Sequence, residues 1–334
     1  MLRLAMGLCL ASALLGAGRE TVLIDTDSGL FGDDGAALVM LMRSPSLVNV
    51  AGVTVVSGNV WAPQGAEYML HILDLLKKPL VQVYTGAASP LVHNSAMVLE
   101  AARRWGRQEF IGAFGDDPAE VKPAPGSKLN ARKAHHEGAV EFLISQIERH
   151  PGEITILAIG PMTNIALALK TDPRIKNNIE RIVIMGGAYL SSETEYNVKR
   201  DRAAAEIVFQ SGVPITAIGL DVASQCKLRE KDLDRMRLAD DPAGHFLIHL
   251  VDLAEEQTHE ANPTLYDPLA IAAIFRPDLL EMQAGTVDVP LSGPGQTIFK
   301  PSPGSKTQVA VKVNALAFFE LFIDRVTKGI GGLR

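Results

Sequence analysis

The sequence predicts an α/β fold, with a doubly wound, mostly parallel sheet and helices on both of its faces. Short apolar runs rich in β-branched residues alternate with longer segments of helical periodicity along most of the chain. The runs are hydrophobic throughout, which is typical of parallel strands that are buried on both faces. Polar or glycine-rich turns follow these runs, and in such a sheet the turns meet at the edge where ligands bind. No repeat or linker divides the chain, so we expect one domain.

The predicted elements alternate between strand and helix, as in a parallel α/β sheet. The predicted strands are residues 21–24, 50–56, 80–84, 154–159, 181–185 and 213–218. The predicted helices are residues 34–43, 62–76, 139–149, 164–170 and 202–211. The tail, 286–334, adds alternating strand patterns and an amphipathic helix over 315–326. Residues 106–136 are rich in proline, glycine and charge, so they are predicted as a long loop near the ligand edge, either a lid or an ordinary surface loop.

The first eighteen residues differ in composition from the rest of the chain. Arg3 precedes a largely apolar run over 4–15, and three small residues close the segment. This pattern is typical of a cleaved secretory signal, so we predict a signal peptide over 1–18, a mature domain over 19–334, and a secreted or periplasmic location. A core strand or helix is the alternative, because the run is shorter than the ~20 residues that span a bilayer.

The composition excludes two classes of partner. The 334 residues carry a formal net charge of −6 and have a pI near 5.8, without a cluster of basic and aromatic residues, so we expect no nucleic-acid partner. No segment after the signal is long and apolar enough to span a membrane. Cys9 would leave with the signal, so Cys226 would be the only cysteine of the mature chain and no internal disulfide could form. We predict that Cys226 is buried as a small apolar residue.

Four aspartates stand where the first predicted strand ends, in the stretch VLIDTDSGLFGDDGAALVML. Asp25 and Asp27 are two residues apart and point to the same side of a strand, while Asp33 and Asp34 open a helix whose dipole favours negative charge. Carboxylates gathered in this way need a cation, a proton or hydrogen bonds to offset their repulsion. A hard divalent cation, Ca²⁺ above all, suits several carboxylate oxygens. A phosphatase of the haloacid dehalogenase type, with Asp25 as its nucleophile, also begins with a strand and Asp-x-Asp and is the alternative.

The stretch DTDSGLFGDDGAAL resembles the signature of the inosine-uridine-preferring nucleoside hydrolase family, D-x-D-x-G-x-D-D, with two extra residues before Asp33. Phe31 occupies a position that is acidic in some family variants. Further motifs follow in the family order over nearly the whole chain: TVVSGNV, GAASPL, ILAIGPMTNIALAL, IVIMGGAY, EYNVKRDRAAA, SGVPITAIGLDV and YDPLAIA. The resemblance implies a single nucleoside-hydrolase-like catalytic domain that hydrolyses the N-glycosidic bond of ribonucleosides to ribose and a free base, in purine or pyrimidine nucleoside catabolism.

The resemblance also implies roles for the residues at matching positions. The implied Ca²⁺ ligands are Asp27, Asp34, Asp267 and the backbone carbonyl of Ile159. Asp25 would orient this group without binding the ion. Asp27 would also be the general base that takes a proton from the metal-bound water. The residues at ribose-binding positions are Asp33, Asn59, Met185, Glu195 and Asn197. The alternatives are a core role for Met185 and turn capping for the two asparagines.

The general acid is the main departure from the family pattern. Tyr266 precedes Asp267, where many family members have a histidine that can protonate the leaving base. A phenol can also donate a proton, but it is a weaker acid than imidazolium near neutral pH. Other candidate acids are His93, His135, His136 and His259. A purine stacked on Trp61, Trp105 or Tyr266 could instead leave without direct protonation. Candidates for a contact to the 5′-hydroxyl, in place of an asparagine of the family, are Ser191 and Ser192.

Tyr266 therefore also leaves open an exported ribonucleoside-binding protein without catalytic activity. In either case the expected partner is a small-molecule ribonucleoside, and the preferred base is not predicted by these residues. Family analogy further implies a homodimer or homotetramer.

Overall fold

The structure is a computed structural model, and it describes residues 19–29, 33–92, 100, 103–104, 120–135, 138–239, 241–258 and 262–327. The signal peptide predicted at 1–18 and the departure at Phe31 lie outside the described residues. So does most of the first half of the predicted loop.

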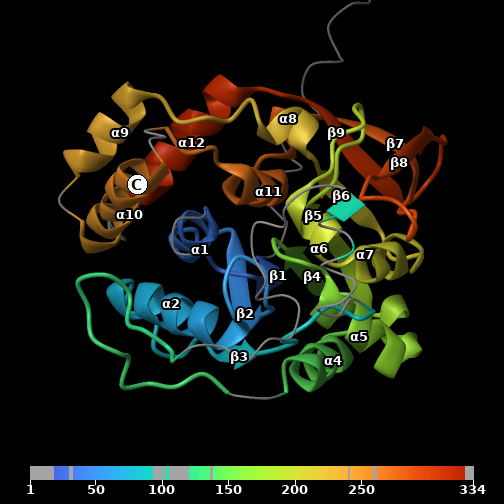
Figure 1. The fold of residues 1–334 in the computed structure, drawn as a ribbon, viewed down its shortest axis with the longest axis horizontal. Coiled ribbons are helices and arrows are strands. Elements are labelled where there is room, and N and C mark those ends of the chain that lie inside the picture. The colour runs from blue at the N-terminus through green and yellow to red at the C-terminus, as the bar shows by residue number, and fades with distance from the viewer. Residues whose placement is uncertain are drawn as a thin grey trace, which may run out of the picture.

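The described chain forms a nine-stranded sheet in the order β3-β2-β1-β4-β5-β6-β9-β7-β8 (Figure 1). The strands are β1 (Glu20–Thr26), β2 (Val48–Val55), β3 (Val83–Thr85), β4 (Ile154–Ala158), β5 (Ile179–Met185), β6 (Ile215–Ile218), β7 (Leu280–Asp288), β8 (Ile298–Pro301) and β9 (Thr307–Val313). All neighbours from β3 to β9 pair in parallel, and β7 runs antiparallel to both β8 and β9. The strand order reverses between β1 and β4, which confirms the doubly wound α/β fold and places a ligand crevice outside the carboxyl ends of these two strands.

Helices cover both faces of the sheet. They are α1 (Asp34–Met42), α2 (Ala62–Leu75), α4 (Ala139–Arg149), α5 (Thr163–Thr171), α6 (Tyr196–Arg200), α7 (Arg202–Phe209), α8 (Leu220–Ala223), α9 (Glu230–Arg237), α10 (Pro242–Thr258), α11 (Tyr266–Phe275) and α12 (Ala315–Thr327), with 3-10 turns η2 (Pro173–Asn177) and η3 (Pro277–Leu279). Helices α1, α2, α11 and α12 share one hydrophobic core, and α4, α5 and α7 share the other (Figure 1). Two cores on opposite faces explain why the central strands are hydrophobic throughout.

Two differences from the predicted elements have clear physical reasons. The predicted strand at 80–84 is wrong in its bounds, because Leu80 lies in a turn with 92% of its surface exposed and β3 begins only at Val83. Helix α11 was missed because it is apolar around most of its circumference, and seven of its ten residues are buried. A helix of this kind shows no amphipathic period for sequence analysis to detect. The short helices α6 and α8, together with α9 and α10, were also not predicted.

The described half of the predicted loop, 120–135, is anchored to helix α2. Asn130 is buried, and its backbone N–H and side-chain Nδ2 donate to Glu67 Oε1 at 2.7 and 2.9 Å. Gln64 and Lys122 exchange two further hydrogen bonds at the surface. These contacts favour a fixed surface segment over a lid for this half. Cys226 is buried, as predicted. In the part of the chain that the structure describes, every helix is too short or too polar to cross a membrane.

Candidate active site

A cavity of about 350 Å³ lies at the carboxyl ends of β1, β4 and β5. Its lining brings together most of the residues that the sequence predicted: Asp27, Asp33, Asn59, Ile159, Met185, Glu195, Asn197, Tyr266 and Asp267. Of the predicted site residues, Asp25 and Asp34 are absent from the described lining. The cavity therefore sits where the reversal of strand order places a ligand crevice.

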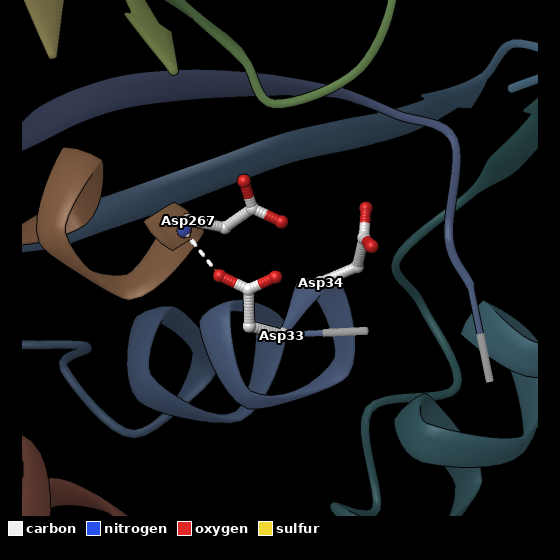
Figure 2. Close-up of side chains that lie close together, drawn as sticks. All are labelled: Asp33, Asp34 and Asp267. Atoms are coloured by element: carbon white, nitrogen blue, oxygen red, sulfur yellow. Dashed lines mark hydrogen bonds between the residues drawn. The ribbon is translucent and has the colours of Figure 1, made fainter. Parts of the chain in front are cut away.

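Three carboxylates form an acidic cluster beside this cavity (Figure 2). One oxygen from each of Asp33, Asp34 and Asp267 lies within 4.8 Å of the other two. Asp33 and Asp34 open helix α1, and Asp267 lies in the first turn of α11, so two helix N-termini meet at the cluster. The Asp33 carboxylate accepts a hydrogen bond from the backbone N–H of Asp267. Partial positive charge at both helix ends stabilises the carboxylates, although it does not balance three of them.

Asp34 is fixed by the chain that leaves β1. Its Oδ1 accepts hydrogen bonds from Thr26 Oγ1 at 2.5 Å and from the Ser28 backbone N–H at 3.0 Å. The Gly29 N–H donates to Oδ2 at 3.3 Å. Asp34 was predicted as a metal ligand together with Asp27 and Asp267. The acidic cluster joins Asp34 and Asp267 with Asp33, which was predicted to hold ribose.

Asp27 is held by the turn that follows β2, through Asn59, whose Nδ2 also lies 3.4 Å from Asp34 Oδ2 and donates to it. Asp27 Oδ2 accepts from the Asn59 backbone N–H at 2.8 Å, and Asp27 Oδ1 accepts from Asn59 Nδ2 at 3.2 Å. Two glycines leave room for this arrangement. A Cβ at Gly58 would lie 2.0 Å from Asp27 Oδ2, and a Cβ at Gly160 would lie 2.7 Å from the Asp27 backbone nitrogen. The glycines of the SGN and IGP turns therefore allow backbone to approach Asp27 closely.

Asp25 does not join the other aspartates. It is fully buried, and its Oδ1 accepts hydrogen bonds from Thr54 Oγ1 at 2.6 Å and from Asn164 Nδ2 at 2.8 Å. Burial raises its pKa to about 7. Asp25 was predicted to orient the other aspartates without binding the ion, and its contacts with β2 and α5 hold it outside the described lining of the cavity; its orienting role stays a prediction. A buried carboxylate outside the cavity is also unsuited to be the nucleophile of a phosphatase.

Burial and the neighbouring negative charges make ionisation of the carboxyl groups in this site less favourable. Burial raises the pKa of Asp33 to about 7, and the charge of Asp34 contributes to this rise. Burial and Asp34 also raise the pKa of Asp27 well above its ordinary value. Burial, followed by the charges of Asp33, Asp34 and Asp27, does the same for Asp267. No described lysine or arginine forms an ion pair with any of these groups. A bound cation would offset this unbalanced charge.

Another part of the cavity lining is built around Glu195. Its carboxylate accepts hydrogen bonds from the backbone N–H groups of Gly187, Asn197 and Val198 at 3.0, 2.8 and 3.0 Å, so it caps helix α6. Asn197 Nδ2 donates to the Met185 carbonyl at 3.1 Å, at the end of β5. Met185 belongs to the hydrophobic core and also lines the cavity. These polar groups are therefore preorganised by backbone contacts.

The sequence model of the inosine-uridine preferring nucleoside hydrolase family matches residues 22–320, which is most of the chain. The chain belongs to this family. It is similar to uridine nucleosidase 1 of Arabidopsis thaliana, with 32% identity over 82% of this chain and 80% of that protein. It is also 30% identical to a pyrimidine-specific ribonucleoside hydrolase of Salmonella gallinarum, over 91% of this chain and 97% of the relative. The protein is therefore an enzyme of the nucleoside hydrolase family. Membership of this family supports hydrolysis of the N-glycosidic bond of ribonucleosides as its reaction.

Solved structures of nucleoside hydrolases share the fold. A plant nucleoside hydrolase aligns with a TM-score of 0.78 and 28% identity, over 93% of this chain and 99% of the other. A purine-preferring ribonucleoside hydrolase from Gardnerella vaginalis aligns with a TM-score of 0.76 and 35% identity, over 92% and 98%. The names of these relatives cover uridine, pyrimidines and purines, so similarity alone does not indicate the base that this nucleoside hydrolase prefers.

Among the candidate acids of this nucleoside hydrolase, Tyr266 borders the cavity, as the first residue of α11. His135 stacks on Tyr84 beside β3 and does not line the cavity, and neither does Trp61 at the start of α2. His93, Trp105, His136 and His259 lie outside the described residues. Ser191 and Ser192 are exposed and absent from the described lining, so the geometry does not support them at the 5′-hydroxyl.

Three further residues line the cavity of this nucleoside hydrolase and were not predicted: Thr194, Tyr196 and Leu220. Tyr196 lies between two predicted ribose-binding residues, and its hydroxyl donates to the Gly58 carbonyl at 3.0 Å. Its place between these two residues in the EYN motif is the one signal in the sequence that could have indicated it. Leu220, at the start of α8, carries no such signal.

Proposed function

We propose that the protein is a Ca²⁺-dependent ribonucleoside hydrolase in which Asp27 activates the attacking water. Family membership supports the reaction class. The observation that carries the finer proposal is the cavity whose lining brings Asp27 together with two residues of the acidic cluster, Asp33 and Asp267, and with Glu195 and Asn197. Such a cavity offers carboxylates to a positively charged transition state and polar groups to sugar hydroxyls.

The donor set suits Ca²⁺. Asp33, Asp34 and Asp267 offer oxygens within 4.8 Å of one another, and Asp27 and Ile159 line the adjoining cavity. Ca²⁺ prefers six to eight oxygen ligands, and its charge would offset repulsion among buried carboxylates. When bound, the ion would supply the positive charge that positions the sugar hydroxyls and the attacking water. We infer that Asp27, Asp34, Asp267 and the Ile159 carbonyl hold it, with Asp33 on the sugar hydroxyls.

Asp27 is placed to act as the general base. The two hydrogen bonds from Asn59 fix the direction of its carboxylate at the cavity wall. With the ion bound, its positive charge would keep this carboxylate ionised and so able to accept a proton. It would take a proton from water as the water oxygen bonds to the anomeric carbon. The electron pair of the breaking bond then goes to the nitrogen of the base.

The surrounding residues act on the two halves of the substrate. Positive charge develops on the sugar as the bond breaks, and Asp33 and Glu195 stabilise it more than they stabilise the neutral substrate. Tyr266 stands at the cavity wall and would face the leaving base. Its phenol can donate a proton to the base, and its ring can stack against it.

Release of free base is the test of this proposal. Inosine, adenosine, guanosine, uridine and cytidine are each incubated with protein starting at residue 19, with saturating Ca²⁺ or with a chelator. We expect base release that falls about 100-fold or more in the chelator. Release that is insensitive to the chelator would contradict the Ca²⁺ dependence. Absence of release, with nucleoside and Ca²⁺ each raising the melting temperature, would favour a non-catalytic binding protein.

A further inference from the structure

The segment 186–199, which carries Glu195 and Asn197, is contacted from outside the cavity by the turn that precedes β8. This turn, residues 295–297, belongs to the hairpin of β7 and β8, the last two strands in the order of the sheet (Figure 1). In that order β6 and β9 stand between the hairpin and β5, whose end begins the segment. A turn that is remote from the site along the chain therefore touches the residues that shape it.

The turn follows the segment in the antiparallel sense, one residue after another. The contacts join Thr297 to Ala188, Gln296 to Ser192 and Thr194, and Gly295 to Lys199. Gly295 has a φ of +108°, and a Cβ there would lie 2.7 Å from the Lys199 Cα in helix α6. Because the contacts lie on both sides of Glu195 in the chain, the turn constrains the segment before and after this carboxylate.

The Thr297 hydroxyl holds the first of these contacts. Its Oγ1 accepts a hydrogen bond from the Ala188 backbone N–H at 3.0 Å and donates one to the Ala188 carbonyl at 2.5 Å. Both residues are buried. Buried backbone groups that lose their partners carry the full cost of leaving water. Without the hydroxyl, the chain at Ala188 would therefore shift toward other partners.

Gly187 connects this contact to Glu195. The Gly187 N–H donates to Glu195 Oε2 at 3.0 Å, and the Gly187 carbonyl accepts from the Leu220 N–H at 2.9 Å. Gly187 has a φ of +82°, and a Cβ there would lie 3.0 Å from Thr297 Cγ2. Thr297 thus packs against Gly187 and binds the next residue. A shift at Ala188 would move the N–H that orients the Glu195 carboxylate.

We propose that Thr297 is a positioning residue for the sugar half of the site. Its hydroxyl fixes residues 187–188, and through the Gly187 N–H it fixes the direction of the Glu195 carboxylate. Thr297 is absent from the described lining of the cavity, so it acts through Glu195 rather than on the sugar. The inference rests on the proposed function in one respect, the contact of Glu195 with the sugar.

Binding of ribose tests this inference without turnover. Dissociation constants of ribose in saturating Ca²⁺ are measured by calorimetry, well below the melting temperature of each variant. Thr297→Val keeps the shape of the side chain and removes the hydroxyl, so ribose should bind about tenfold more weakly. Thr297→Ser keeps the hydroxyl and should bind ribose within about twofold of wild type. Thr286→Val, at an exposed position of β7, is the control and should leave ribose binding unchanged.

A double variant separates positioning from a general effect on the fold. The ratio kcat/KM is measured for base release from uridine and inosine. If Thr297 acts through Glu195, adding Thr297→Val to Glu195→Ala should lower kcat/KM by less than about twofold, because the effects of coupled residues do not add. A purely structural role would lower kcat/KM by the same factor in both backgrounds, and this result would overturn the inference.

The single variants can also contradict the inference. Wild-type ribose affinity in folded Thr297→Val would do so, as would equal losses in the valine and serine variants. If Thr297→Val does not fold, Gly295→Ala displaces the turn from α6 and should weaken ribose binding several-fold. Gly293→Ala, where a Cβ has room, should not, and equal affinities in the two glycine variants would count against the inference. Wild-type protein that binds ribose but releases no base would contradict the proposed function, while weaker ribose binding in Thr297→Val would still support the role of Thr297.

Discussion

At the scale of single residues, Asp27 combines the geometry and the chemistry of the site. It borders the cavity and accepts both of its hydrogen bonds from Asn59. Asp27→Asn preserves the shape of the side chain but removes its negative charge. We expect steady-state base release to fall by ~10²–10⁴, the usual contribution of a general base. Asp278→Asn, at an exposed carboxylate paired with Arg276, is the control and should keep full activity. Full activity in Asp27→Asn would show that Asp27 is not the general base.

Tyr266 allows a second test at this scale. Tyr266→Phe keeps the ring and removes the phenol proton. If the phenol protonates the leaving base, kcat for nucleosides should fall by about 10²-fold or more, whereas a nitrophenyl riboside needs little protonation and should be cleaved as before. Tyr84→Phe, whose hydroxyl contacts Gln82 beside the edge strand β3, is the matched control. Equal losses on both substrates would indicate a packing role for Tyr266.

At the scale of elements, the site depends on turns that let backbone approach the carboxylates. Gly58, in the turn after β2, leaves no room for a Cβ, which would lie 2.0 Å from Asp27 Oδ2. Gly58→Ala should therefore displace Asp27 and lower kcat/KM about tenfold or more, because small misplacements of catalytic groups are costly. Gly293→Ala, where the nearest atom would lie at 3.5 Å, should retain activity. Wild-type kcat/KM in Gly58→Ala would show that the turn adapts without cost.

Sequence reasoning located the elements of the site better than their contacts. The turns after β1, β2, β4 and β5 could be predicted, because hydrophobic strands that end in polar or glycine-rich motifs must meet at one edge of a parallel sheet. Helix α11 could not be predicted from periodicity, because it is apolar around most of its circumference. The split of the aspartates was equally hidden. Two residues apart in an ideal strand, Asp25 and Asp27 would face the same side. In the structure Asp25 is held by Thr54 and Asn164, whereas Asp27 is held by Asn59.

At the scale of the whole molecule, the acidic cluster links the site to the core. Asp33 and Asp267 are 234 residues apart in the chain, and they meet because α1 and α11 pack together with both N-termini at the cavity. Nothing local in the sequence specifies this contact. One consequence is that repulsion at the cluster acts directly on two buried helices. Stability of the fold and occupancy of the metal site should therefore be coupled.

Metal-free protein should lose stability as pH rises. The folded-state pKa values of Asp25 and Asp33 are raised from 3.8 to about 7, and burial and neighbouring charge also raise the pKa values of Asp27 and Asp267. A carboxyl group whose pKa is raised by folding contributes its full stabilisation below the unfolded-state pKa of 3.8. This contribution decreases as pH rises and is lost above the folded-state pKa. In chelator, the melting temperature should thus fall between about pH 4.5 and 7.5.

Ca²⁺ should reverse this trend, because it binds the ionised carboxylates of the folded state. At 100 times its dissociation constant it should add about 2.7 kcal/mol to the free energy of unfolding near pH 7.5 and much less near pH 4.5. Scanning calorimetry with and without chelator at both pH values measures the difference. Asp34→Asn should reduce the Ca²⁺ effect, while Asp278→Asn should not. A Ca²⁺ stabilisation that is the same at both pH values would mean that ion binding and carboxylate ionisation are not linked at this cluster.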